Sequence, residues 1–259
     1  MRAGYGRGAG ATRHGEVLTP AALDFARRHA PMATMLDPTR LERADVLVAR
    51  APFAFLVAPT QLADGDREAL LRDFPRYGSA GFFPYREQDC GPALRALVAQ
   101  LGGGEIADAI GRRLGVPALS ALPSITTLSD SVHRRHGTIH TDSRSKVVTA
   151  LLYLNPSWPD TSDGCLRLLR AGDDIDALAA PEIRPLYGTL VAFRRADNSW
   201  HGHLPFEGER KVVQVAWLAS AEDAARKQRR GGFSRVVKGI AGGLDRIWGS
   251  RRRANARHS

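Results

Sequence analysis

The sequence predicts a mainly β protein, an antiparallel sandwich or jelly roll, with supporting helices ahead of it. From residue 124 to residue 220 the chain consists of short β-type runs split by turns, with no helical pattern between them. Helical patterns occur before residue 117 instead. A chain of 259 residues is long enough to bury one sizeable core together with some additional helical structure.

The residues before the β region are expected to form a flexible opening and a helical support region. Residues 1–36 contain a Gly/Arg-rich start and one short helix at 20–30, and most of this segment is expected to be poorly ordered. Residues 37–120 form the support region. Its expected elements are a strand at 53–58, a helix at 62–74 that is stopped by proline, a loop at 74–84, and helices at 91–101 and 105–114.

Residues 121–221 are expected to be the catalytic core. The β-type runs there lie at 125–128, 147–154, 165–169, 189–193 and 212–218. No internal repeat is present in the sequence. After residue 221 the pattern becomes helical and basic, so 222–259 is a separate tail. The predicted order is therefore opening, support region, core and tail.

The net charge of +10 comes mainly from this tail. Between Glu222 and Ser259 there are eleven Lys or Arg residues against three Asp or Glu residues, which leaves the other residues close to neutral. A basic tail is weak support for a nucleic-acid partner, which we consider unlikely. The composition, rich in Arg, Ala and Gly, is typical of a GC-rich bacterial genome.

The sequence also favours a location in a reducing cytoplasm. No apolar run approaches the roughly 20 residues needed to span a bilayer. The start of the chain lacks the apolar region of a secretory signal. The two cysteines, Cys90 and Cys165, form neither a disulfide framework nor a Cys-x-x-Cys zinc pattern.

The motif His140-Thr141-Asp142 is the main candidate for chemistry. Side chains at positions i and i+2 of a strand point to the same face, so an imidazole and a carboxylate enter the same space. A third ligand must come from a distant strand, where His201 and His203 are available. Two histidines and one carboxylate on one face of a metal leave the opposite face open, which is the arrangement of non-haem Fe(II) oxygenases.

A cation close behind the distal histidine suits a 2-oxoglutarate co-substrate, whose far carboxylate needs a buried positive charge. Arg210 and Lys211 are both available at the start of the last strand. Strand alternation groups Arg210 with Val212, Gln214 and Ala216, which is the smaller and more polar set expected of a site wall. Arg210 is therefore favoured and Lys211 is kept as the alternative, with Gln214 and His203 as candidate pocket-lining residues.

These residues together resemble the prolyl-4-hydroxylase-like branch of the Fe(II)/2-oxoglutarate dioxygenases. The resemblance covers about 140–218 and includes His140-Thr-Asp142, the run Val147 to Asn155 with Trp158, and His201 with Arg210 or Lys211. It implies a double-stranded β-helix (jelly roll, cupin-like), iron bound by His140, Asp142 and His201, and Tyr153 as a 2-oxoglutarate ligand. Relatives have a Gly-Gly pair where this chain has Gly164-Cys165.

The resemblance implies hydroxylation of a substrate coupled to decarboxylation of 2-oxoglutarate to succinate, with ascorbate as a candidate reductant. The substrate class stays open between a small molecule, a saccharide and a peptidyl residue. Two alternatives use the same barrel. A cupin-like hydrolase or isomerase would share the metal triad but would not need Tyr153 and Arg210 together, and a non-catalytic metal-binding module would not need to retain all three ligands.

The tail has its own hypothesis. Apolar residues fall on one stripe of a helix. They are Phe233, Val236, Val237, Ile240, Leu244, Ile247 and Trp248. The stripe can dock on the core, with the basic residues solvated, or residues 230–259 can lie on the inner face of an anionic membrane. The predicted protein is thus cytoplasmic, with peripheral membrane contact as the second interpretation.

Overall fold

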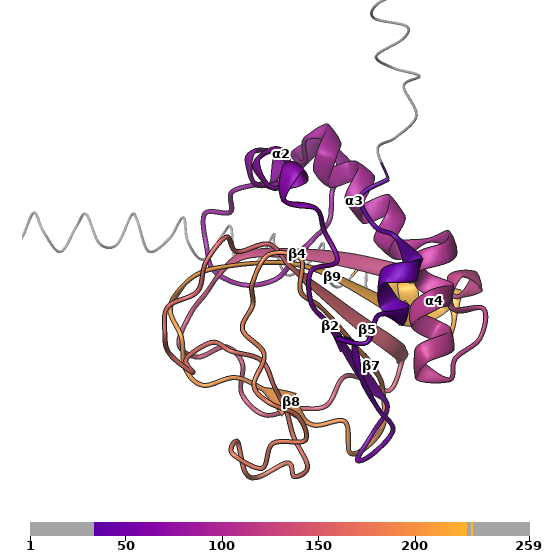
Figure 1. The fold of residues 1–259 in the computed structure, drawn as a ribbon, viewed down its shortest axis with the longest axis vertical. Helices are drawn as coiled ribbons and strands as arrows, with labels where there is room; N and C mark the ends of the chain where they lie inside the picture. The colour runs from indigo at the N-terminus through magenta and orange to yellow at the C-terminus, as the bar shows by residue number, and fades with distance from the viewer. Residues whose placement is uncertain (1–33, 227–228, 230–259) are drawn as a thin grey trace, which may run out of the picture. The chain divides into compact units, whose positions relative to one another are not determined.

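The computed structural model describes residues 34–226 and 229. Its main sheet has seven strands in the order β1-β2-β7-β5-β9-β4-β3, and every neighbouring pair is antiparallel. The strands are β1 (Leu47–Ala49), β2 (Phe55–Ala58), β3 (Phe83–Pro84), β4 (Ser124–Val132), β5 (Lys146–Tyr153), β7 (Leu190–Arg194) and β9 (Gly208–Leu218). The two longest, β4 and β9, pair with each other, and β5 borders β9 on its other side (Figure 1).

A second, smaller sheet lies opposite the main one. It pairs β6 (Arg167–Leu168) with β8 (His201–Gly202), and a β-bridge adds His140 on the far side of β8. Apolar side chains of β6 pack against side chains of β5 and β7, so the two sheets enclose a shared interior. Two antiparallel sheets arranged in this way form the predicted double-stranded β-helix, and the fold class is confirmed.

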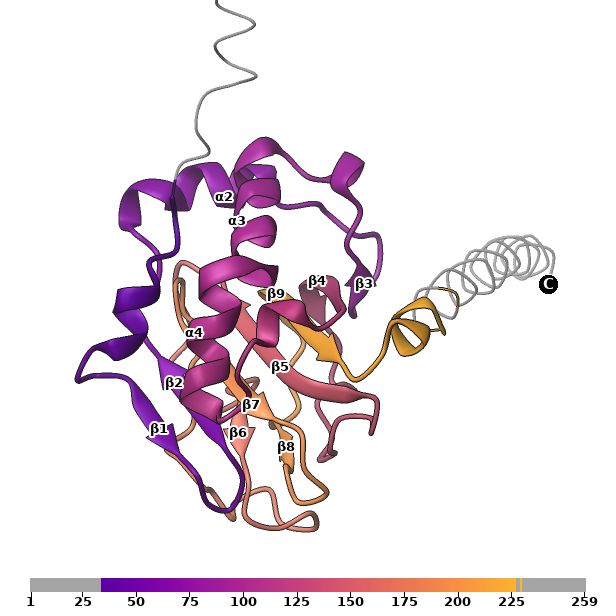
Figure 2. The same cartoon turned by 90° about the vertical axis from the view of Figure 1, so that its right-hand side faces the viewer.

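Helices cover the other face of the main sheet, as Figures 1 and 2 show for α3 and α4. The α-helices are α2 (Arg67–Asp73), α3 (Pro92–Gly102) and α4 (Gly104–Leu114), and short 3-10 turns are η1 (Pro38–Glu42), η2 (Asp64–Asp66), η3 (Glu87–Asp89) and η4 (Leu119–Ala121). Alternate residues of each central strand pack against these helices. On β5 these are Val148, Ala150 and Leu152, whereas Leu151 and Tyr153 face the smaller sheet.

The region predicted as helical support also contributes strands to the catalytic sheet. β2 pairs with β7, and β1 extends the sheet beyond it. β3 pairs with β4 inside the segment that the sequence predicts as a loop. Two-residue strands such as β3 carry no periodicity that a sequence pattern can reveal. Residues 37–120 and 121–221 therefore both contribute strands to the main sheet.

Two predicted elements lie outside the described residues. These are the short helix at 20–30 and the amphipathic stripe within 230–259. The start of the predicted tail, residues 221–226, is helical. Within the described part of the chain, none of the helices combines the length and apolarity needed to cross a membrane.

Candidate metal centre

Backbone pairing between the two sheet segments brings the two candidate histidine ligands together. The His140 N–H donates to the His201 carbonyl at 3.0 Å, and the His201 N–H donates back to the His140 carbonyl at 3.0 Å. Residues paired in this way across antiparallel strands have side chains on the same face. The ring centroids lie 4.3 Å apart, although some sixty residues separate the two histidines in the chain.

Hydrogen bonds to the backbone orient both rings. His140 Nδ1 lies 2.7 Å from the Thr138 carbonyl oxygen, and His201 Nδ1 lies 3.0 Å from the Ser199 carbonyl oxygen. A carbonyl can only accept, so each Nδ1 carries the proton and each Nε2 keeps its lone pair. Metal-binding histidines are commonly held in this way by their second nitrogen.

Asp142 supplies an oxygen ligand two residues after His140. Lys146 Nζ donates to Asp142 Oδ1 at 2.6 Å, and the Thr149 hydroxyl donates to Asp142 Oδ2 at 2.5 Å. Burial raises the pKa of Asp142, but the charge of Lys146, the nearby His201 and these hydrogen bonds outweigh it and lower the pKa below its ordinary value. The carboxylate is therefore ionised and fixed in position at neutral pH.

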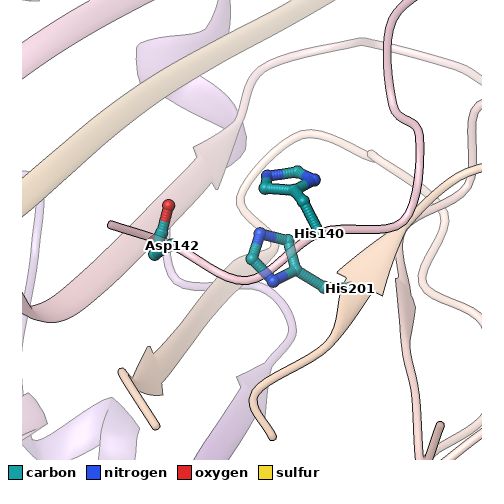
Figure 3. A group of neighbouring side chains, drawn as sticks. All are labelled: His140, Asp142 and His201. Atoms are coloured by element: carbon teal, nitrogen blue, oxygen red, sulfur yellow. The ribbon is translucent and has the colours of Figure 1, made fainter. Parts of the chain in front are cut away.

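The three side chains fit a divalent metal. One ligand atom from each of His140, Asp142 and His201 can be chosen so that all lie within 4.8 Å of one another. Figure 3 shows His140 and Asp142 on one segment, with His201 reaching the same space from its neighbour. Two imidazole nitrogens and one carboxylate oxygen are the donor set that suits Fe(II) with open positions.

A small cavity of about 120 Å³ connects this cluster with Arg210. Arg210 is 3% exposed, and its guanidinium donates from Nε to the Gly164 carbonyl at 2.9 Å and from Nη2 to the Tyr153 hydroxyl at 3.1 Å. Within the described residues no carboxylate pairs with Arg210. A buried charge whose partners are only neutral oxygens is costly, so the site calls for an anion.

Lys211 points away from this cavity. Its Nζ forms an ion pair with Glu209 Oε1 at 2.5 Å, and its backbone N–H donates to Asn155 Oδ1 at 2.7 Å. Val213, Val215 and Trp217, the residues of the same strand parity, pack in the helix-side core. The structure thus gives β9 the facing that the alternation argument favours, with Arg210 and Gln214 towards the cavity.

His203 and Gln214, the two candidate lining residues, both border the cavity. His203 Nδ1 lies 2.7 Å from the Leu204 carbonyl oxygen, which leaves Nε2 unprotonated, and Gln214 Nε2 donates to the Thr127 hydroxyl at 3.2 Å. His203 does not belong to the cluster of potential metal ligands. Gly137 packs closely on it, because a Cβ there would lie 2.1 Å from His203 Nε2.

The pair Gly164-Cys165 stands where relatives have Gly-Gly, and it keeps the first glycine, which the site requires. Gly164 has a φ of +72°, and its carbonyl accepts the bond from Arg210. A Cβ at this position would lie 2.8 Å from the ring atoms of Trp158 and Phe206. Cys165 is buried, and its thiol donates to the Thr161 carbonyl. The second residue of the pair therefore tolerates a side chain, whereas the first does not.

Several residues of the site escaped the sequence analysis. Thr149 could have been found, because it has the same strand parity as Tyr153. Phe193 packs on His201 with ring centroids 4.5 Å apart, and Phe82 lies at the cavity edge, yet neither carries a recognisable pattern. Lys146 has the wrong strand parity on β5 for a residue that faces the cavity.

Because His201 and His203 are buried, we expect the free energy of unfolding of the metal-free protein to fall at acidic pH. Burial and the neighbouring His140 lower the pKa of His201 to about 4, and burial and Arg210 lower that of His203 to about 4. An unfolded histidine titrates at about 6.5, so the unfolded chain binds more protons below that pH and stability falls as the pH is lowered. The stabilisation is present above pH 6.5 and is lost towards pH 4.

Urea unfolding of the chelator-treated protein at pH 7.5 and pH 5.5 measures this effect. We expect a loss of roughly 1.4 kcal/mol from each of the two histidines. His203→Gln removes one titrating group and should reduce the pH-dependent loss by about half. Equal stability at the two pH values would show that these rings are not held neutral by burial.

Comparison with known proteins identifies the class. Residues 128–219 match the sequence model of the 2OG-Fe(II) oxygenase superfamily. This matched segment contains the three candidate ligands together with Tyr153 and Arg210. The predicted enzyme class, a 2-oxoglutarate-dependent oxygenase, is confirmed. Fe(II) and 2-oxoglutarate are the cofactor and co-substrate that the superfamily implies. No curated protein sequence gives a match.

Solved structures with a similar fold include several prolyl hydroxylases. A Pseudomonas putida prolyl-4-hydroxylase is 19% identical, with 64% of this chain and 93% of that chain covered and a TM-score of 0.47. A Trichoplax adhaerens prolyl hydroxylase is 15% identical, with 81% and 97% covered and a TM-score of 0.43. HygX from Streptomyces hygroscopicus, solved with nickel and 2-oxoglutarate, is 14% identical, with 73% and 89% covered and a TM-score of 0.42. Identity this low says nothing about substrate.

Proposed function

We propose that this protein hydroxylates its substrate with Fe(II) and 2-oxoglutarate, with His140, Asp142 and His201 as the iron ligands. One observation carries the proposal. Among the described residues, the buried Arg210 has only neutral hydrogen-bond partners, and it shares one small cavity with a cluster of two histidines and one carboxylate. A dicarboxylic acid with a keto group next to one carboxylate matches both ends of this cavity, because one end can chelate a metal and the other needs a cation.

One set of side chains binds the metal, and a second set, Arg210 and Tyr153, binds the co-substrate. When bound, Fe(II) supplies the activation of O2, by which one oxygen atom enters a substrate C–H bond and the other enters succinate as CO2 leaves. Arg210 receives the far carboxylate of 2-oxoglutarate with N–H groups not used by Gly164 and Tyr153. The Tyr153 hydroxyl donates a further hydrogen bond to it. Phe193 and Leu151 line the cavity with apolar surface and exclude water.

The remainder of the substrate is expected to bind outside the metal cavity. That cavity is smaller than a typical ligand pocket of about 300 Å³ or more, and 2-oxoglutarate occupies it. A groove of about 590 Å³ lies beside it between α3, β3 and β4, and Phe82, which is 45% exposed, lines both. None of the described residues that line the groove has a charged side chain. We therefore expect an uncharged segment of a small molecule, saccharide or peptide there.

Turnover of a substrate library tests the proposal. The full-length protein with Fe(II), 2-oxoglutarate and O2 should release succinate with members of one substrate class, in a one-to-one ratio with hydroxylated product, and His201→Ala should release none. Ascorbate is expected to prolong turnover. Conversion of a substrate without 2-oxoglutarate or O2 would instead favour the cupin-like hydrolase or isomerase.

A further inference from the structure

A β-bulge turns Lys146 towards the metal centre. Lys146 pairs with Leu218, and the next registered pair is Val148 with Trp217, so two residues of β5 advance against one of β9. Regular alternation from Thr149, which lines the cavity, would put Val147 on the cavity side and Lys146 among the helices. Val147 packs against the helix-side core instead. The extra residue in β5 therefore turns the Lys146 side chain towards Asp142.

Lys146 forms an ion pair with the Asp142 carboxylate. Its Nζ lies 2.6 Å from Asp142 Oδ1, and the two side chains are 12% and 9% exposed. The Thr149 hydroxyl donates to the other oxygen, Asp142 Oδ2, at 2.5 Å. Each oxygen of the Asp142 carboxylate therefore accepts one hydrogen bond. The Lys146 ammonium carries a full positive charge and the Thr149 hydroxyl carries none, so Lys146 is the main electrostatic partner of Asp142.

The positive charge of Lys146 opposes the binding of a metal ion by Asp142. A divalent ion held by Asp142 would share one carboxylate with the Lys146 ammonium, and like charges this close repel strongly in a partly buried site. In the metal-free protein, by contrast, the same ammonium neutralises a carboxylate that would otherwise be buried without a countercharge. Lys146 therefore favours the metal-free state relative to the metal-bound state.

We propose that Lys146 is a positioning residue that substitutes for the metal ion at Asp142 and limits the affinity of the triad for divalent metal. The inference rests on the proposed function, because it takes His140, Asp142 and His201 as the metal ligands. Lys146 holds the Asp142 carboxylate in one orientation before a metal ion binds. Its removal should loosen the empty site and strengthen metal binding at the same time.

Mn(II) titration of the full-length, chelator-treated protein, read from the electron paramagnetic resonance signal of free Mn(II), tests this inference. Lys146→Met keeps the apolar stem and removes the charge, and it should bind Mn(II) at least about tenfold more tightly than the wild type. Lys146→Arg restores a cation and should stay within about threefold of the wild type. The melting temperature of Lys146→Met should fall in the metal-free protein and recover when Mn(II) is added.

Thr149→Val is the matched control, because it removes a hydrogen bond from the same carboxylate without changing the charge. It should bind Mn(II) equally or more weakly than the wild type. Equal or weaker binding by Lys146→Met, or tighter binding by Thr149→Val, would overturn the inference. Lys146→Gln, which keeps a donor but no charge, gives the same test if the methionine variant cannot be purified.

The same titration separates this inference from the proposed function. Wild-type protein should bind Mn(II) at one site that is lost in His201→Ala. If the wild type binds no Mn(II), or if His201→Ala still binds it, the metal assignment itself fails. If the wild type binds as expected and Lys146→Met does not bind more tightly, only the role of Lys146 is rejected.

Discussion

Arg210→Ala should raise the 2-oxoglutarate concentration required for half-maximal turnover at least about a hundredfold. The variant leaves the far carboxylate of the co-substrate buried without a cation, and an unpaired charge of this kind typically costs ~3–5 kcal/mol. Arg210 also holds Tyr153 and the Gly164 carbonyl, so part of the loss comes from a less ordered cavity. Succinate release as a function of 2-oxoglutarate concentration measures the change.

Lys211→Ala is the matched control, one residue further along the same strand. Lys211 pairs with Glu209 on the other face of β9, so its loss should barely change the 2-oxoglutarate requirement. Tyr153→Phe should cause a smaller rise than Arg210→Ala, because one hydrogen bond to a charged group is worth ~1.5–3 kcal/mol. A large effect of Lys211→Ala together with a small effect of Arg210→Ala would transfer the anchoring role to Lys211.

His201→Ala should weaken metal binding by more than about a hundredfold, since even the loss of an outer-shell partner costs 10–100-fold. Turnover should fall to background for the same reason. His140→Ala and Asp142→Ala should behave alike, and all three variants should retain their fold, which circular dichroism of the metal-free proteins checks. Co(II) absorption reports metal binding independently of activity.

His203→Ala is the comparison for the distal ligand. His203 lines the same cavity and shares its strand parity with His201, but it lies outside the ligand cluster. We expect this variant to bind metal normally. Retention of Co(II) binding in His201→Ala together with its loss in His203→Ala would reassign the third ligand.

Strand periodicity accounts for much of what could be predicted. The facing of β5 and β9 follows from strand alternation, so the sequence alone favours the Arg210 side of β9 as the cavity side. The spacing of His140 and Asp142 likewise requires only that both residues lie in an extended segment. Residue type and spacing leave both His201 and His203 as candidates for the third ligand, and only the family resemblance favours His201. The reciprocal backbone bonds between His140 and His201 could not be read from local sequence.

Lys146 marks the limit of such arguments. A bulge inverts the parity of one residue, and whether it forms depends on how β5 registers against a strand some seventy positions away. The joining of β1 and β2 to β7 is non-local in the same sense. Pairings of this kind depend on tertiary contacts, which local propensity does not encode.

Anaerobic addition of Fe(II) and 2-oxoglutarate to the full-length protein tests the central claim most directly. Chelation of Fe(II) by the keto acid end of 2-oxoglutarate at a site held by His140, Asp142 and His201 should produce a weak visible charge-transfer band that requires both components. Arg210→Ala should shift its appearance to higher 2-oxoglutarate concentration, and His201→Ala should abolish it. Absence of the band in the wild type, with Fe(II) shown to be bound, would contradict the assignment of this cavity to 2-oxoglutarate.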